Sequence, residues 1–230
     1  MFLKFTILIS FLSITIKSQE LEAFNSKVSR LEAFSSSKTC PDYSTIRQPS
    51  VDGDQFKVDE LSGKWFFLAT NEPTIPSFCI CGYNNFTIEH DVKKYEYATN
   101  LTCRGSPFTI HIKGNLSSDP TSPGNLVENA EIYGHNIAPL VPNMVFKVDR
   151  GDDGEITRIY TYACVGKIFG HELFSFNILA RDNSYSLNEI QSFISDIDPE
   201  VVDKFEMSKM KFTTKEDWAS TCLSSDGFIQ

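Results

Sequence analysis

The sequence is short of basic side chains, and this shortage excludes several classes of partner. Its 230 residues carry 21 Lys and Arg against 30 Asp and Glu, a net charge of −9. Nucleic-acid backbones are bound chiefly by clustered Lys and Arg that displace counterions, and the chain has no such cluster. The same charge balance argues against attraction to anionic membrane surfaces. We therefore expect no nucleic-acid partner.

Long hydrophobic runs are missing beyond the first residues. A spanning helix needs about 20 consecutive apolar residues, and no segment after position 18 approaches that length. The apolar run 5–16 is too short to span a membrane; it follows Lys4 and precedes the small residue Ser18, a pattern typical of a secretory signal peptide. The sequence predicts a signal peptide over residues 1–18, a secreted protein and no integral membrane span.

Metal-ligand patterns are also missing. The doublet Cys79-x-Cys81 lacks the two-residue gap of a zinc knuckle, and no second pair or histidine cluster completes four ligands. An acidic run near position 150 has Gly151 where a calcium-binding loop needs its second oxygen ligand. We therefore expect no metal and no cofactor. We interpret the run as a solvated hairpin turn formed by Asp149, Asp152, Asp153 and Glu155.

Catalytic groupings are equally scarce. The histidines fall on predicted turns and outward strand positions, without a nucleophile at a suitable spacing: His90, His111, His135 and His171. A cysteine nucleophile would need a free thiol of low pKa. The cysteines instead form an even set, which in an exported chain predicts up to three disulfides: Cys40, Cys79, Cys81, Cys103, Cys164 and Cys222. We expect no catalytic residues.

A two-residue alternation of apolar and polar side chains is the main structural signal that is present. It starts at about Gly63 and is typical of half-buried strands, with turn signals at 119–124 and 152–154 between the runs. We predict eight consecutive antiparallel strands near residues 63–70, 83–90, 93–102, 107–116, 126–133, 143–150, 156–166 and 172–181.

Three glycosylation sequons orient these strands. They begin at Asn85, Asn100 and Asn115. A glycosylated asparagine must face solvent, so its immediate neighbours on a strand face inward. The polarity pattern agrees with this assignment at nearly every position. Cys103 is the exception, because strict alternation places it inward unless a bulge or the strand end turns it.

The segments on either side of the strands have different patterns. Ser186 and Glu189 form a capping-box pattern at the start of a predicted helix. Its apolar face should pack against the outer wall of the barrel, and it consists of Leu187, Ile190, Phe193, Ile194 and Ile197. The repeat at 21–24 and 31–34 has two copies, too few for a solenoid. We divide the chain into a signal peptide (1–18), an arm (19–50), a barrel domain with its helix (51–222) and a tail (223–230).

Two motifs at opposite ends of the strand pattern resemble those of the lipocalins. Gly63-Lys64-Trp65 resembles the opening motif of that family, and Ile178-Leu179-Ala180-Arg181 its closing motif. The resemblance implies an all-β fold, an eight-stranded antiparallel up-and-down barrel with a C-terminal helix on its outside. It also implies a floor motif of Gly63, Trp65 and Arg181, in which the guanidinium stacks on the indole. Over residues 38–222 the sequence is most similar to apolipoprotein D and the insect bilin-binding group.

The same resemblance implies a disulfide pattern. The segments 38–41, 160–164 and 81–88 resemble the cysteine-containing segments of that group, as does Cys222. By this likeness Cys40 pairs with Cys164 and Cys81 with Cys222, which leaves Cys79 for Cys103. The Cys79-x-Cys81 doublet departs from the family pattern, so which of the two pairs with Cys222 stays open.

A barrel of eight strands is wide enough to enclose one small hydrophobic ligand. We therefore expect a carrier of a fatty acid, sterol, retinoid or tetrapyrrole, with Tyr95, Tyr97 and Asn177 orienting the ligand. Parity along the strands gives the predicted lining: Phe67, Phe86, Ile88, Tyr95, Tyr97, Leu101, Phe108, Ile110, Ile112, Asn177 and Leu179.

Two other functions compete with the carrier. The segment 71–74 resembles the lipocalin domain of violaxanthin de-epoxidase, a distant relative that is an enzyme, and Cys79 or Cys81 would then be its nucleophile. Alternatively, a filled barrel could act as an interaction protein through the loops at 71–78 and 119–125. A cell-surface receptor is the further candidate partner.

Overall fold

A computed structural model describes residues 41–72, 75, 79–89, 94–103, 106–117, 119–132, 135–136, 141–168, 171–202 and 209–222. The predicted signal peptide, the repeat in the arm and the tail from residue 223 lie outside these ranges.

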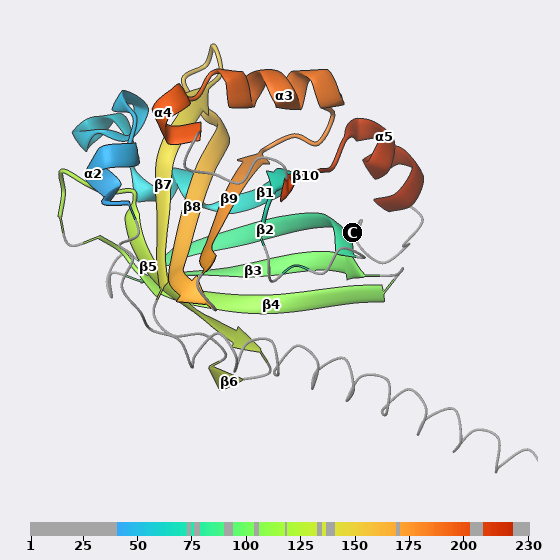
Figure 1. Ribbon diagram of the computed structural model, residues 1–230, viewed down its shortest axis with the longest axis horizontal. Helices are drawn as coiled ribbons and strands as arrows, with labels where there is room; N and C mark the ends of the chain where they lie inside the picture. Colours follow the sequence, from blue (N-terminus) through green and yellow to red (C-terminus); the bar gives the residue numbers. More distant parts are fainter. Residues whose placement is uncertain are drawn as a thin grey trace, which may run out of the picture.

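Eight antiparallel strands close into a barrel (Figure 1). They are β1 (Gly63–Thr70), β2 (Cys79–Glu89), β3 (Lys94–Cys103), β4 (Ser106–Asn115), β5 (Asn125–Ile132), β7 (Val141–Arg150), β8 (Ile156–Ile168) and β9 (His171–Ala180). Each strand pairs with the next, and β9 pairs with β1. The short strands β6 (His135–Asn136) and β10 (Lys211–Phe212) pair antiparallel with β5 and β1. The predicted eight-stranded up-and-down barrel is confirmed.

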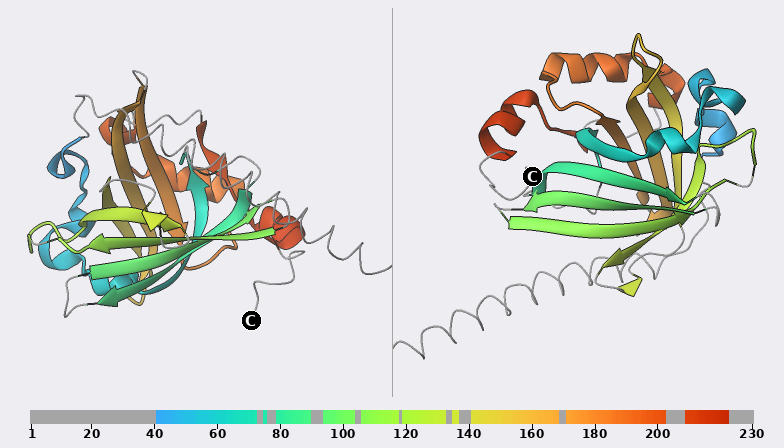
Figure 2. Two further views of the ribbon diagram at one scale, coloured as in Figure 1. Left: turned by 90° about the horizontal axis from the view of Figure 1, so that it is seen from below. Right: turned by 180° about the vertical axis from the view of Figure 1, so that it is seen from behind.

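Helical segments lie outside the barrel, before and after its strands (Figures 1 and 2). Those before it are α2 (Tyr43–Ile46) and the 3-10 turns η1 (Pro49–Val51), η2 (Gly53–Gln55) and η3 (Val58–Leu61). Those after it are α3 (Leu187–Ser195), α4 (Pro199–Val202), α5 (Lys215–Asp217) and the π-helical turn η6 (Trp218–Cys222). No helix among the described residues has the length and apolar character needed to cross a membrane.

Helix α3 begins at the predicted cap. The Ser186 hydroxyl accepts a hydrogen bond from the Glu189 amide, and the Glu189 carboxylate accepts one from the Ser186 amide at 2.7 Å. Ile190 and Phe193 are buried in the main core, so the helix packs on the barrel as expected. Leu187 does not join them: it is 41% exposed. It lies on the first turn, beside exposed Asn188, and burial begins one turn later.

Trp65 and Arg181 seal one end of the barrel through the stacked contact that the sequence motifs imply. The Arg181 guanidinium carbon lies 3.8 Å from the centroid of the Trp65 ring, and the indole is fully buried. Trp65 Nε1 donates to the Leu61 carbonyl at 2.7 Å, while Arg181 donates to the Glu60 carbonyl at 2.7 Å. The contact therefore joins both ends of the strand sequence to η3.

The segment before the barrel, part of which the sequence assigns to the arm, packs against β7. The Tyr43 hydroxyl donates to the Val145 carbonyl at 2.8 Å, and the Gln48 amide to the Phe146 carbonyl at 2.7 Å. Tyr43 and Ile46 are buried in the main core. These hydrogen bonds therefore reach β7 beyond the residues that pair with β5.

A bulge in β2 directs the neighbouring cysteines Cys79 and Cys81 to different disulfide partners. Two residues, Cys81 and Gly82, stand opposite one residue of β3, and Cys81 has a φ of +62°. Cys79 pairs in register with Cys103, to which it is disulfide-bonded, and both contact inward Leu101. Cys81 is bonded instead to Cys222 in η6, outside the barrel. These are the pairings that the resemblance implies, and they settle which cysteine takes Cys222.

The other predicted disulfide is described in part. Cys164 on β8 is disulfide-bonded, and its predicted partner Cys40 lies outside the described residues. Cys103 follows strict alternation after all, because the bulge lies on β2 rather than on its own strand.

Gly63→Ala should destabilise the protein more than Gly154→Ala. Both glycines have positive φ, +95° and +81°, so each alanine costs roughly 1 kcal/mol in backbone strain. At Gly63 the new Cβ would also lie 3.2 Å from Arg181 Nη1, whereas at Gly154 no described atom lies within 4 Å. We expect a further loss of about 1 kcal/mol at Gly63. Urea denaturation measures both values, and equal losses would contradict this account of the floor.

Removal of the Cys81–Cys222 disulfide should cost more stability than removal of Cys79–Cys103. The first joins residues 141 apart in sequence and the second residues 24 apart. The chain-entropy model gives about 5 and about 3.5 kcal/mol. The paired serine variants C81S/C222S and C79S/C103S can be compared by urea denaturation. The reverse order would show that contacts in the native state outweigh the loop entropy.

Candidate functional site

The predicted lining residues whose side chains are described lie on the inner face of the barrel. Register partners in a sheet share a face, and the rows Phe86–Tyr97–Ile112 and Ile88–Tyr95 cross the sheet in register. Most of the predicted lining is buried or half-buried: Phe67, Phe86, Ile88, Tyr95, Tyr97, Leu101, Ile110, Ile112, Asn177 and Leu179. The side chain of Phe108 lies outside the described part.

The sequon asparagines lie on the opposite face. Asn85 on β2 and Asn115 on β4 are exposed, as is His111 on β4. Asn100 is half-buried: its amide nitrogen donates to the Ala98 carbonyl at 3.2 Å, and its oxygen accepts from Thr109 at 2.9 Å. All three are therefore oriented as the alternation predicts.

Polar side chains on the inner face are mostly paired with one another. The Thr70 hydroxyl donates to Asn177 Oδ1 at 2.6 Å, and Asn177 Nδ2 donates to the Thr161 hydroxyl at 3.2 Å, a chain across β1, β9 and β8. The Thr99 hydroxyl donates to Asn84 Oδ1 at 2.8 Å. Because Asn177 is held in this chain, its amide groups are less available to a ligand than the sequence suggests.

A second polar cluster spans the interior and contains a carboxylate. Glu128 on β5 receives hydrogen bonds at Oε2 from the Tyr97 hydroxyl at 2.7 Å and from Asn143 Nδ2 at 2.7 Å, with the Tyr95 hydroxyl at 3.4 Å. Asn143 Nδ2 also lies 3.3 Å from the Tyr97 hydroxyl oxygen. Strands β4 and β5 separate β3 from β7 in the sheet. The contact between Tyr97 and Asn143 therefore crosses the interior.

Aromatic rings position this cluster. Tyr97 stacks on Phe86 with centroids 4.5 Å apart, and the ring of Tyr95 lies parallel to that of Tyr97 at 6.2 Å. Gly114 on β4 makes room for Tyr95, since a Cβ there would collide with the tyrosine ring. The hydroxyls of both tyrosines are thereby directed at Glu128.

The electrostatics of the cluster favour the neutral acid. Burial raises the pKa of the Glu128 carboxyl from 4.5 to about 7, although hydrogen bonds from Asn143 and Tyr97 oppose the shift. The negative charge of Glu72, which follows β1, adds to it. A carboxyl group inside the barrel can therefore change its charge near neutral pH.

Sequence reasoning missed Glu128 and Asn143. Leu126 is buried and Asn125 exposed, so extending the alternation from Leu126 would have placed Glu128 on the inner face. For Asn143 no comparable signal existed, because a register shift on β7 between Val145 and Lys147 interrupts the alternation.

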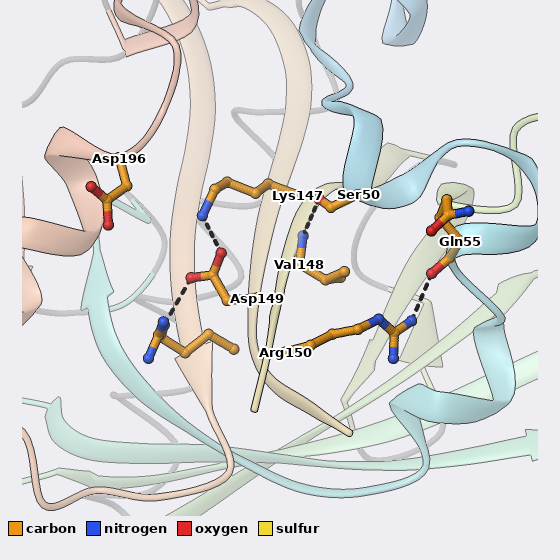
Figure 3. Close-up of a pocket in the computed structure, with 8 residues that line it drawn as sticks. Ser50, Gln55, Lys147, Val148, Asp149, Arg150 and Asp196 are labelled. Carbon is orange, nitrogen blue, oxygen red and sulfur yellow. Dashed lines mark hydrogen bonds and ion pairs between the residues drawn. The ribbon is translucent and has the colours of Figure 1, made fainter. Parts of the chain in front are cut away.

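A second set of polar residues lines a depression of about 460 Å³ on the outside (Figure 3). Lys147, Asp149 and Arg158 meet here, with Arg158 Nε 2.8 Å from Asp149 Oδ2 and Lys147 bonded to Oδ1. Arg150 reaches Glu60 at 2.7 Å. The cations around this depression are paired, so we interpret it as a structural junction between β7, β8 and the preceding segment.

This junction corrects the interpretation of the acidic run. Asp152, Asp153 and Glu155 are exposed in the turn after β7, as predicted. Asp149 is half-buried instead and also accepts from the Tyr160 hydroxyl at 2.6 Å. Burial alone would raise the pKa of Asp149, but its hydrogen bonds from Lys147, Tyr160 and Arg158 hold it below the usual value. Asp149 therefore belongs to the barrel wall.

The groups proposed for catalysis or metal binding are not assembled. Cys79 and Cys81 are both disulfide-bonded, so neither is the free thiol that the enzyme alternative requires. His111 is exposed, and the side chains of the other three histidines lie outside the described part. No group of three or more His, Cys, Asp or Glu that could hold a metal ion occurs among the described residues.

Solved structures share this architecture. Insecticyanin from the tobacco hornworm Manduca sexta is 14% identical, with 77% of this chain and 87% of that chain covered at a TM-score of 0.56. Lobster apocrustacyanin A1 is 13% identical, with 74% and 89% covered at a TM-score of 0.50. No protein-family model and no curated protein matches the sequence.

Because the sequence identities are low, these likenesses show the fold alone. The closed eight-stranded barrel, the stacked floor and the outer helix define the class: this chain has the lipocalin fold. The likeness extends over most of the length of both solved proteins.

The stability of the protein should fall between pH 4.5 and 8 because of Glu128. The folded state retains the Glu128 proton up to about pH 7, whereas the unfolded chain releases it near 4.5. The stabilisation is complete below pH 4.5 and is lost as the pH rises through 7. By linkage, wild type should lose up to about 3 kcal/mol relative to Glu128→Gln over this range. Urea denaturation at pH 5 and pH 8 measures the difference, and identical pH dependence in the two proteins would disprove it.

Proposed function

We propose that this protein is a secreted lipocalin that binds and carries a small hydrophobic molecule inside its barrel. The observation that carries the proposal is the inner face, which combines aromatic and aliphatic side chains with a few polar groups. Such a mixture is typical of ligand sites, where apolar contacts supply affinity and polar groups fix orientation. The fatty acid, sterol, retinoid and tetrapyrrole classes are the candidates to test.

Two kinds of observation support export. The described cysteines are all disulfide-bonded, which is typical of proteins from oxidising compartments. The three sequon asparagines lie on the outer face, where glycans could be accommodated. The proposal includes glycosylation at Asn85, Asn100 and Asn115, a bond between Cys40 and Cys164, and a relationship to apolipoprotein D. A cell-surface receptor that takes up the loaded carrier is a further proposed partner.

The main competitor is a barrel filled by its own side chains, acting through its outer surface. The stacked rings of Phe86, Tyr97 and Tyr95 occupy part of the interior and favour that function. Extraction of native secreted protein with organic solvent, followed by mass spectrometry, separates the two. The carrier should release a stoichiometric lipid, and a filled barrel should release none.

A change inside the barrel should weaken binding while a change outside should not. Ile110→Trp on the inner face of β4 would occupy ligand space, whereas His111→Trp adds the same side chain at the neighbouring exposed position. We expect Ile110→Trp to weaken binding of oleic acid, retinol, cholesterol or biliverdin at least about 10-fold, the effect of losing a few apolar contacts. His111→Trp should bind as wild type does. Titration calorimetry provides the measurement.

His111→Trp is the control for a loss of binding in Ile110→Trp. Equal effects of the two tryptophans would contradict binding inside the barrel. Absence of binding of every class by wild-type protein would contradict the carrier function itself.

A further inference from the structure

We propose that the barrel binds a hydrophobic amine, whose ammonium group lies between Glu128 and Asn143. The inference rests on the proposed function and deepens it, because it names the chemistry of the polar end of the ligand. It starts from the two acceptor atoms that the polar cluster leaves without a donor.

The first acceptor belongs to Glu128. Its three hydrogen bonds from Tyr95, Tyr97 and Asn143 all end on Oε2. Within the described part of the chain, Oε1 accepts none, and the side chain as a whole is half-buried rather than sealed. The carboxylate is thus fixed by one oxygen and presents the other.

The second acceptor belongs to Asn143. Its Nδ2 group donates to Glu128, which fixes the orientation of the amide, and Oδ1 is then buried with no hydrogen-bond partner among the described residues. A buried carbonyl oxygen without a donor costs roughly 1–3 kcal/mol. A ligand that supplies N–H groups would recover this cost at Asn143 and at Glu128 together. An ammonium group has three N–H donors and no acceptor, which matches this pair.

The surroundings favour a cation over an anion. Tyr95 and Tyr97 meet the carboxylate through their hydroxyl groups, which are neutral donors. None of the described inner-face residues that line the cluster is basic, so the head group of a fatty acid would meet Glu128 without a compensating charge. This observation ranks fatty acids below amines among the candidate ligands.

The titratable groups that face Glu128 come from two elements. They are Tyr95 and Tyr97 on β3 and Glu72 after β1, while β4 contributes Ile112 and Gly114 and β7 contributes Asn143. Both tyrosines have a pKa raised well above 10 by burial, so they stay neutral donors. Glu128 itself gains its negative charge near pH 7. An amine that stays protonated should therefore bind more tightly as the pH rises through 7.

The test compares three ligands with the same alkyl chain: decylamine, decanol and decanoate. Each is titrated calorimetrically into the full-length secreted protein at pH 5.5 and 8.5. Decylamine is charged at both values. If it binds only the ionised site, a pKa of about 7 predicts affinity on the order of 30-fold higher at pH 8.5. Decanol should show no such rise, and decanoate should bind more weakly than decanol at pH 8.5.

Two glutamine variants test whether Glu128 is the residue that binds the amine. Glu128→Gln should weaken decylamine binding at pH 8.5 at least about 10-fold, the value of a charge-assisted hydrogen bond, and should abolish its pH dependence. Decanol binding should be retained. Glu96→Gln removes the same charge from an exposed position on the outer face of β3 and should behave as wild type. If Glu128→Gln does not fold, the ligand and pH comparison on wild type still decides the question.

The outcomes separate the two proposals. Binding of decanol without preference for decylamine, or equal loss in the two variants, overturns the amine site and leaves the carrier function intact. Failure of all three ligands to bind, together with failure of the retinoid, sterol and tetrapyrrole probes, overturns the carrier function as well. A decylamine preference that rises with pH and requires Glu128 supports both.

Discussion

The pairing of β9 with β1 is the constraint on which the rest of the structure depends. It closes the eight strands into a ring and turns the alternation of side chains into an inside and an outside. The Trp65–Arg181 stack lies where these two strands meet and ties them to the segment that precedes the barrel. Closure of the barrel therefore encloses an interior and creates an end, which the Trp65–Arg181 stack covers.

A protected interior makes every polar atom in it consequential. Most polar side chains on the inner face satisfy one another, as in the chain from Thr70 through Asn177 to Thr161. The cluster around Glu128 differs, because its donors all bind one oxygen, Oε2 of Glu128. Two acceptors, Glu128 Oε1 and Asn143 Oδ1, are left without a donor among the described residues. In an apolar enclosure this imbalance costs stability. Natural proteins keep such costs chiefly where function uses them, and the proposed amine site rests on this imbalance.

Much of the architecture could be predicted from the sequence because closure makes the alternation strict. The outward sequons at Asn85 and Asn115, the floor motif and the capping box at Ser186 all depend on local spacing. The features that were missed depend on register instead. Alternation from Leu126 would have placed Glu128 on the inner face, but its meeting with Asn143 depends on the pairing of β5 with β7, in which Leu126 lies opposite Asn143. The burial of Asp149 likewise comes from side chains on β7 and β8. Local patterns carry no information about which distant residues share a site.

The bulge in β2 also bears on how the correct disulfides form. Cys79 and Cys81 are two positions apart and would share one face of a regular strand, where either could react with either partner. With Cys81 at a φ of +62° the two thiols are sent to opposite sides of the wall, one toward Cys103 and the other toward Cys222. The position of the bulge thereby determines which cysteine meets which partner. Disulfide formation then stabilises the native register of β2 with β3 and disfavours a shifted one.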